Sequence, residues 1–165
     1  MKKSTTEATL YLTRGALIGA IYFALTYLAF AFGLSSGAIQ FRISEALCVL
    51  PIFMPEAIPG LFIGCFIANL ATGCAIWDVI FGSIATLIGA IGARLLRFLP
   101  RKLKWLAPLP TILANAIIVP FVLMYAYGVE DGYFFLALTV AIGEIVCAGA
   151  GGSFLYYSME KTFRQ

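Results

Sequence analysis

Long apolar stretches, broken by short clusters of glycine, proline or charged residues, set the pattern of this 165-residue chain. A membrane-spanning helix needs about 20 apolar residues, and several stretches reach that length. The breaks divide the chain into six apolar segments, at about 9–32, 42–54, 56–71, 77–99, 109–127 and 133–157. The pattern predicts an all-α integral membrane protein, a six-transmembrane-helix bundle. No linker splits residues 1–165, so we expect a single transmembrane domain.

The second and third segments are short for a hydrocarbon core of about 30 Å. They meet at Pro51, Pro55 and Pro59, and such a cluster ends one helix and starts the next. Two interpretations stay open, namely two short spans or a re-entrant hairpin that dips in from outside. A hairpin adds no net crossing, so both interpretations leave the orientation of the remaining helices unchanged.

Composition agrees with a lipid environment, because 62% of the residues are hydrophobic and only 12% are charged. A soluble domain has roughly 45–50% apolar and about 25% charged residues. The chain has no histidine, and its four cysteines (Cys48, Cys65, Cys74 and Cys147) form no CxxC pair. Serine–histidine and cysteine–histidine catalysis is therefore excluded, and a classical zinc site or other metal cofactor is not expected.

Lysine and arginine residues gather in three places that six crossings would put on one side of the membrane. They are Lys2, Lys3 and Arg14, then Arg94, Arg97, Arg101, Lys102 and Lys104, and finally Lys161 and Arg164. The opposite loops carry almost none, and one of them holds Glu130 and Asp131. The positive-inside rule then predicts that both termini are cytoplasmic. The net charge of +3 is explained by this grouping and suggests no nucleic-acid partner.

Small residues mark one stripe of the first segment, where Ala16, Ala20 and Ala24 recur at every fourth position beside Gly15 and Gly19. Such spacing lets another helix approach closely. Packing within the monomer and a docking face for another membrane protein are both open interpretations.

Charged and amide side chains inside the spans are rare, costly and therefore candidates for function. Glu144 lies mid-way along the sixth segment, at the greatest predicted depth of any acid, where an unpaired carboxylate is strongly disfavoured. Asn115 lies at a similar depth in the fifth segment. The pair offers a carboxylate and an amide to a ligand, or else it is a structural clamp between two helices.

The other polar candidates lie toward the outer end of the bundle. Arg42 and Glu45 are three residues apart, so they face a ligand together or form a mutual salt bridge. Asn69 and Asp78 bracket an outer turn, and capping of a helix is the structural alternative for Asp78. Trp77 is either a ligand contact or an interfacial belt residue, and the same belt role suits Tyr125, Tyr127 and Tyr133.

Beyond Glu144 and Asn115, these polar groups lie in the outer half of the predicted bundle. No continuous polar path crosses the bilayer, which argues against a channel. No convincing internal repeat is present, which argues against a self-sufficient secondary transporter. The distribution predicts a pocket that captures a solute from outside and needs partners to release it inward.

Two ungapped runs carry a family resemblance. They are Ile39-Gln40-Phe41-Arg42-Ile43-Ser44-Glu45-Ala46-Leu47 with Leu50-Pro51, and Gly64-Cys65-Phe66-Ile67-Ala68-Asn69 followed by Trp77-Asp78-Val79-Ile80-Phe81-Gly82-Ser83. With these runs the chain resembles the QueT family, the queuosine-precursor substrate-binding (S) components of energy-coupling factor (ECF) transporters. The resemblance covers nearly the whole chain.

The resemblance implies a six-helix bundle of the ECF S-component type in a bacterial cell membrane. It implies a 7-deazaguanine base as ligand, and partners that comprise a transmembrane coupling subunit and two ATPase subunits. Docking through Ala16, Ala20 and Ala24 is implied as well. The chain has no GxxxxGK[ST] loop, so ATP hydrolysis would be the partners' task.

For such a ligand we expect Glu144 to accept the adjacent N–H donors of the guanine-like edge, with Asn115 beside it. Glu45 or Asp78 would neutralise an aminomethyl cation, and Trp77 or Phe41 would stack on the ring. A different vitamin-like heterocycle is the alternative ligand. A small membrane-embedded enzyme and a purely structural subunit are the alternatives from other classes, and the absence of histidine and of a paired-acid motif disfavours the enzyme.

Overall fold

The computed structural model describes residues 5–35 and 40–163, all of which are helix or connecting loop. The elements are α1 (Thr5–Ala31), η1 (Ile43–Ile52), α2 (Ala57–Ala71), α3 (Ile76–Leu95), η2 (Leu96–Phe98), η3 (Arg101–Leu106), α4 (Leu109–Ala126), α5 (Tyr133–Glu144), η4 (Ile145–Gly151) and α6 (Gly152–Phe163). The expected all-helical class and the six-helix bundle are confirmed.

Four stretches of the described residues are long and apolar enough to cross a membrane. They are Thr5–Ala31, Ile76–Phe98, Lys102–Ala126 and Tyr133–Lys161. The remaining two helices are shorter, since η1 has 10 residues and α2 has 15. With a rise of about 2.0 Å per residue in a 3₁₀-helix and about 1.5 Å in an α-helix, each covers only about 20 Å. Both are shorter than a hydrocarbon core of about 30 Å, as the apolar pattern predicted, and their lengths agree both with two short spans and with a re-entrant hairpin.

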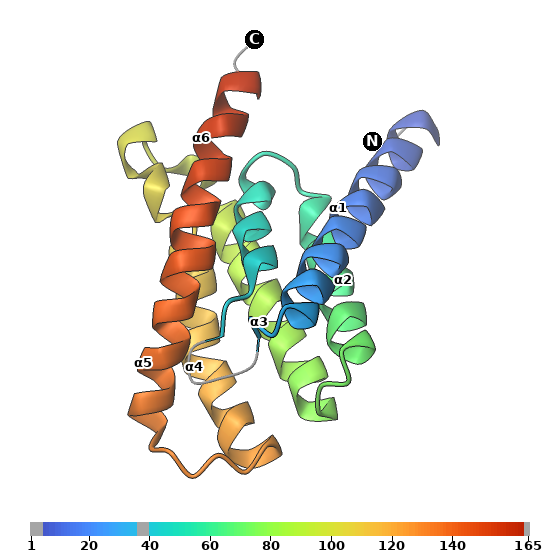
Figure 1. Ribbon diagram of the computed structural model, residues 1–165. Coiled ribbons are helices and arrows are strands. Elements are labelled where there is room, and N and C mark those ends of the chain that lie inside the picture. Colours follow the sequence, from blue (N-terminus) through green and yellow to red (C-terminus); the bar gives the residue numbers. More distant parts are fainter. Residues whose placement is uncertain (1–4, 36–39, 164–165) are drawn as a thin grey trace.

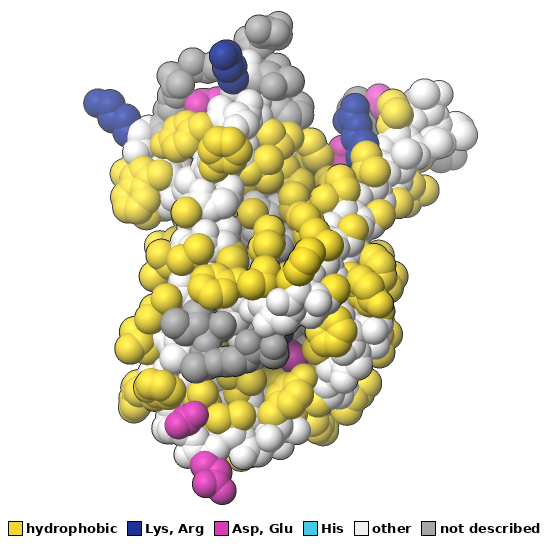
Figure 2. All heavy atoms as spheres, viewed as in Figure 1, with side chains coloured by type: hydrophobic (Ala, Val, Ile, Leu, Met, Phe, Trp, Pro, Cys, Tyr) yellow, Lys and Arg dark blue, Asp and Glu magenta, His cyan; other side chains and the backbone are white. Residues whose placement is uncertain are grey.

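The helices run so that both ends of the described chain lie at one end of the bundle, together with η2 and η3 (Figure 1). We call this the basic end, because Arg14, Arg97, Lys102, Lys104 and Lys161 belong to the segments gathered there. The loop between α4 and α5, with Glu130 and Asp131, lies at the opposite end, which we call the loop end (Figure 1). Hydrophobic side chains cover the flank between the two ends (Figure 2).

Helices α1 and α2 touch through their backbones. A Cβ atom on Gly19 would lie 2.8 Å from the carbonyl oxygen of Gly60, and one on Gly64 would lie 2.7 Å from that of Gly19. A Cβ on Gly60 would fall on the carbonyl oxygen of Gly15. Only glycine fits these positions, so the α1–α2 pair is fixed by its small residues.

The centre of the bundle is η1, a 3₁₀-helix whose side chains are mostly buried. Its last carbonyls are held by Arg94 of α3, whose guanidinium donates to Pro51 O at 2.9 Å and to Ile52 O at 3.0 Å. Glu56, at the start of α2, pairs with Arg14 of α1 at 3.4 Å. Two arginines therefore pin the η1–α2 turn at its basic-end side, and both helices lead from there toward the loop end.

The last predicted span, over 133–157, is one continuous helical stretch in the structure, Tyr133–Lys161. Its hydrogen-bond pattern changes along the way, from α5 to the π-helical η4 and then to α6, which the apolar pattern did not predict. π-Helical turns inside α-helices occur frequently at functional sites. Here the wider turns begin directly after Glu144, and Gly151 at their end lets η1 approach at Ala46. Helix α4 has its own irregularity, a buried proline at Pro120.

Candidate functional site

A cavity of about 590 Å³ lies near the loop end of the bundle. Its wall combines the end of α1, the start of η1, the α2–α3 turn and the outer part of the α4–α5 hairpin. The described lining residues are Thr26, Ala29, Phe30, Ser35, Gln40, Phe41, Arg42, Asn69, Thr72, Gly73, Cys74, Asp78, Leu123, Tyr127, Val129, Asp131, Phe135 and Leu136. Both motif runs of the sequence thus contribute to one wall.

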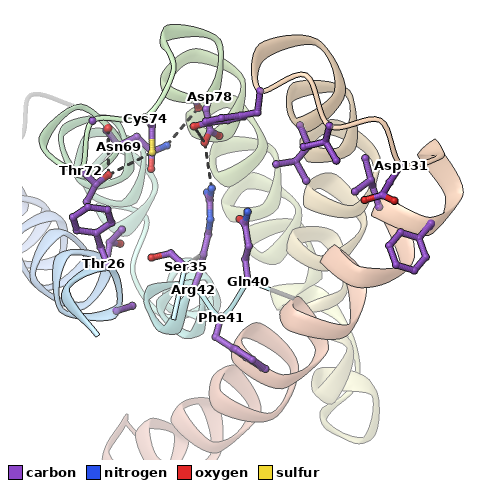
Figure 3. Close-up of a pocket in the computed structure, with 18 residues that line it drawn as sticks. Thr26, Ser35, Gln40, Phe41, Arg42, Asn69, Thr72, Cys74, Asp78 and Asp131 are labelled. Carbon is purple, nitrogen blue, oxygen red and sulfur yellow. Dashed lines mark hydrogen bonds and ion pairs between the residues drawn. The ribbon is translucent and has the colours of Figure 1, made fainter. Parts of the chain in front are cut away.

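The polar centre of this wall is an ion pair. Figure 3 shows the Arg42 side chain pointing toward Asp78, and Arg42 Nη2 lies 3.6 Å from Asp78 Oδ2. The same carboxylate oxygen accepts a hydrogen bond from the Tyr127 hydroxyl at 3.0 Å. The Tyr127 hydroxyl oxygen in turn accepts a hydrogen bond from the backbone N–H of Ala75 at 3.1 Å. The start of α3, the entry to η1 and the end of α4 are joined at this point.

Tyr127 lies in the loop after α4, outside the spanning segments. Burial raises the pKa of its phenol above the ordinary value, and the nearby Asp78 carboxylate raises it further. The hydroxyl therefore stays protonated at physiological pH and remains a donor to the carboxylate.

The second oxygen of that carboxylate, Asp78 Oδ1, is buried and has no hydrogen-bond partner. Asn69 lies beside it, and its amide donates to the backbone carbonyl of Asp78 at 3.4 Å. Gly82, one turn further along α3, packs closely against these groups. A Cβ there would lie 3.1 Å from both Asn69 Nδ2 and Asp78 Oδ1, and 3.7 Å from Arg42 Nη1. An unpartnered buried acceptor is costly unless a ligand or water satisfies it.

Glu45 belongs to a separate, fully buried cluster that does not line the cavity. Its Oε1 accepts from the Tyr22 hydroxyl and, at 3.3 Å, from the Thr86 hydroxyl. Its Oε2 accepts from the Cys48 thiol at 3.0 Å. The mutual Arg42–Glu45 salt bridge considered from their spacing does not form, because Arg42 pairs with Asp78 instead.

Glu144 and Asn115 lie side by side deeper in the bundle, and neither lines the cavity. They are 5% and 1% exposed, respectively. Glu144 Oε2 and both polar atoms of the Asn115 amide have no hydrogen-bond partner. The two side chains are close enough to interact, and these three atoms still have room for a further hydrogen-bond partner, so the arrangement suits both a clamp between two helices and a ligand contact. One turn earlier in α4, the hydroxyl of Thr111 is also buried and unpartnered.

The two aromatic candidates lie in different places. Phe41 lines the cavity. Trp77 is 55% exposed, stacks on Phe81 with ring centroids 6.0 Å apart, and lines an apolar groove on the outside of α3 and α4. The position suits the interfacial belt role.

The alanine stripe and its neighbouring glycines face different surroundings. Ala16, Ala20 and Ala24 are exposed along α1, whereas Gly15 and Gly19 are buried against α2. The small residues of the first segment thus divide between internal packing and a free face.

Sequence reasoning missed several polar residues of the site. Thr26 and Thr72 line the cavity, and Tyr22 closes the Glu45 cluster. Hydroxyl groups in apolar helices give little signal, because they bond to their own helix, as Thr26 does to Tyr22 O at 2.9 Å. Tyr127 was interpreted only as a belt residue, and its position beside a predicted turn was the available clue.

Comparison with known proteins shows which family shares this sequence. The family profile described as "QueT transporter" matches residues 12–161. A curated relative, "Queuosine precursor transporter QueT" of Lactococcus lactis subsp. cremoris, is 36% identical over 88 residues, which are 53% of this chain. The aligned part is 50% of that relative, so the match spans about half of its length. No solved structure matches the chain. Because the profile covers most of the sequence and both motif runs of the cavity wall, the chain belongs to the QueT transporter family.

Proposed function

We propose that this protein is the substrate-binding subunit of an ECF-type importer and that it captures a queuosine precursor, a 7-deazaguanine base, from outside the cell. Membership of a transporter family makes it a transport component rather than an enzyme. The observation that carries the proposal is the cavity at the loop end, with the Arg42–Asp78 pair in its wall and an unpartnered carboxylate oxygen.

The size and character of the cavity suit a small flat heterocycle. Sites for small molecules commonly have volumes of about 300–1,000 Å³, mostly apolar walls and a few placed polar groups. The volume of about 590 Å³ lies in that range. Apolar side chains such as Ala29, Leu123 and Leu136 form much of the wall, and the polar groups gather around Arg42.

We assign the first contacts to the residues around the ion pair. Asp78 Oδ1 would accept an N–H of the ligand or its aminomethyl ammonium group, and Phe41 would stack on the ring. Asp78 is favoured over Glu45 for this cation, because both oxygens of Glu45 already accept protein hydrogen bonds. Phe41 is favoured over Trp77, whose ring lies on the outside of the bundle. Arg42 and Asn69 complete this part of the site.

Glu144 and Asn115 would recognise the guanine-like edge once the ligand moves deeper. Glu144 follows Leu136 of the cavity wall by two turns, a distance of about 12 Å along the helix. Both helices have an irregularity beside this pair, Pro120 after Asn115 and η4 after Glu144. Pivoting of the outer α4–α5 hairpin at these two points would join the pair to the cavity.

The orientation and the partners complete the proposal. We place the loop end outside and both termini in the cytoplasm, because lysine and arginine gather at the basic end. The exposed Ala16, Ala20 and Ala24 would dock on the transmembrane coupling subunit, since small side chains allow close helix contact. Two ATPase subunits would supply ATP hydrolysis.

Reconstitution tests the function. Proteoliposomes that hold the protein with the coupling subunit and both ATPases, and ATP inside, should accumulate a labelled 7-deazaguanine. The same vesicles without ATP, or without this subunit, should not. Equal accumulation with and without this subunit would refute the proposal. Accumulation of another heterocycle alone would identify a different ligand and retain the transport role.

A further inference from the structure

The segment between α3 and α4 combines basic and exposed apolar side chains in a way that the transport function does not use. Residues 94–105 carry Arg94, Arg97, Arg101, Lys102 and Lys104, and no acidic residue occurs between Asp78 and Glu130. The two short 3₁₀ turns η2 and η3 form most of this segment. It lies at the basic end, between two membrane-competent helices (Figure 1).

The apolar side chains of this segment point away from the protein. Leu95 is 65% exposed, Phe98 75%, Leu103 41% and Trp105 57%. They interleave with the basic residues along the chain. Because the segment joins two spanning helices, these side chains lie where the hydrocarbon core meets the headgroups, a level that tryptophan favours.

The basic side chains of the segment divide by what they contact. The Arg94 guanidinium donates hydrogen bonds to two backbone carbonyl oxygens at the end of η1. The Arg97 guanidinium lies over the ring of Phe98, 4.4 Å from the ring centroid. This cation–π contact does not neutralise the positive charge of Arg97. Among the residues that the structure describes, no carboxylate pairs with Arg97, Lys102 or Lys104. Three cationic groups are therefore available to an external anion.

We propose that residues 95–105 form an interfacial anchor that selects anionic phospholipids. The exposed apolar side chains enter the boundary of the acyl chains, and Arg97, Lys102 and Lys104 bind the phosphate-bearing headgroups around them. Each lysine or arginine near an anionic membrane surface raises the affinity of its segment for that surface by about fivefold. Three such side chains should therefore enrich anionic lipids around this segment. A lipid surface fits better than a protein partner, because the apolar groups are spread singly among the charges rather than gathered in one patch.

The loop end provides a matched comparison within the same chain. Trp77 is also about half exposed and lies at the outer surface, but its neighbours in the groove are apolar or aromatic, with no lysine or arginine. The chain has two tryptophans, one in each environment. Trp77→Phe leaves Trp105 as the only reporter at the basic end, and Trp105→Phe leaves Trp77 as the only reporter at the loop end.

The test is fluorescence quenching of the full chain in vesicles of equal parts phosphatidylcholine and phosphatidylglycerol. Brominated acyl chains are placed on one lipid or the other. Trp105 should be quenched about twofold more strongly by brominated phosphatidylglycerol than by brominated phosphatidylcholine. Trp77 should be quenched equally by both. Equal quenching of Trp105 by the two lipids would overturn the proposal.

A charge variant separates lipid binding from general basicity. In the Trp77→Phe background, Arg97→Gln, Lys102→Gln and Lys104→Gln together should abolish the preference of Trp105, and added salt should weaken it in the unaltered segment. Lys161→Gln, which removes an exposed cation on α6 at the same end, should leave the preference intact. Equal quenching in the parent, with loss of partner assembly in the triple variant, would assign the segment to a protein contact and refute the lipid anchor.

Discussion

Gly82→Ala tests the polar wall of the cavity without changing any charge. The added methyl group would lie 3.1 Å from Asp78 Oδ1 and 3.1 Å from Asn69 Nδ2. Ordinary contacts of a Cβ begin at about 3.4 Å, so one of these groups must shift by a few tenths of an ångström. The methyl group also covers the carboxylate oxygen that we assign to the ligand.

The expected loss follows from the hydrogen bond that is blocked. A hydrogen bond to a charged group contributes about 1.5–3 kcal/mol. Since about 1.4 kcal/mol corresponds to a tenfold change in affinity, Gly82→Ala should weaken ligand binding by about tenfold to a hundredfold. The change does not weaken the helix, because alanine is favoured over glycine in a helix interior by about 0.5–1 kcal/mol.

Isothermal titration of the detergent-solubilised variant with the deazaguanine ligand measures this loss, and a melting curve checks the fold. Gly152→Ala, at the start of α6, is the matched control, because its Cβ would make only ordinary contacts, the nearest 3.4 Å from the carbonyl oxygen of Ala46. The control should bind as the parent does. An unchanged affinity in Gly82→Ala, with an intact fold, would show that the ligand does not use this wall.

Four further changes test other parts of the account. Glu144→Gln should reduce affinity at least about tenfold at unchanged expression, since a neutral amide accepts less strongly than a carboxylate; an equal affinity in a titration removes this residue from the site. Tyr127→Phe deletes a donor 3.0 Å from the cavity carboxylate and should weaken binding by about tenfold; a parental binding curve would contradict its role. Gly60→Ala drives a methyl group into the backbone of α1 and should cost about 1–3 kcal/mol, seen as a lower melting temperature; a parental melting curve would refute the close α1–α2 contact. Ala20→Trp, on the exposed stripe, should leave ligand binding intact but abolish copurification with the coupling subunit, and retained assembly would refute docking there.

The apolar pattern predicted the helices because lipid forces every spanning segment to be apolar and internally hydrogen-bonded. It predicted the shortness of η1 and α2 for the same reason. The apolar pattern could not predict the π-helical η4. A π turn differs from an α turn by one residue in its hydrogen-bond register, and this difference does not require a particular residue composition. The η4 segment packs against η1, where Gly151 approaches Ala46, and such a contact between distant segments is not visible in the apolar pattern.

The site was predicted in part, since Arg42, Asn69 and Asp78 were candidates and the structure brings them together from three segments. Their partners were not predictable, because pairing across helices depends on how each helix is rotated. Successive residues of a helix point about 100° apart. Trp77 therefore faces outward while Asp78 faces the cavity, although both belong to one motif run.

The central claim is that this chain binds a 7-deazaguanine. The most direct test titrates the purified protein with the aminomethyl precursor, the cyano precursor, queuine and a set of unrelated vitamins. The account predicts saturable binding of at least one deazaguanine and none of the unrelated vitamins. Absence of binding to all three deazaguanines by a folded protein would contradict the claim.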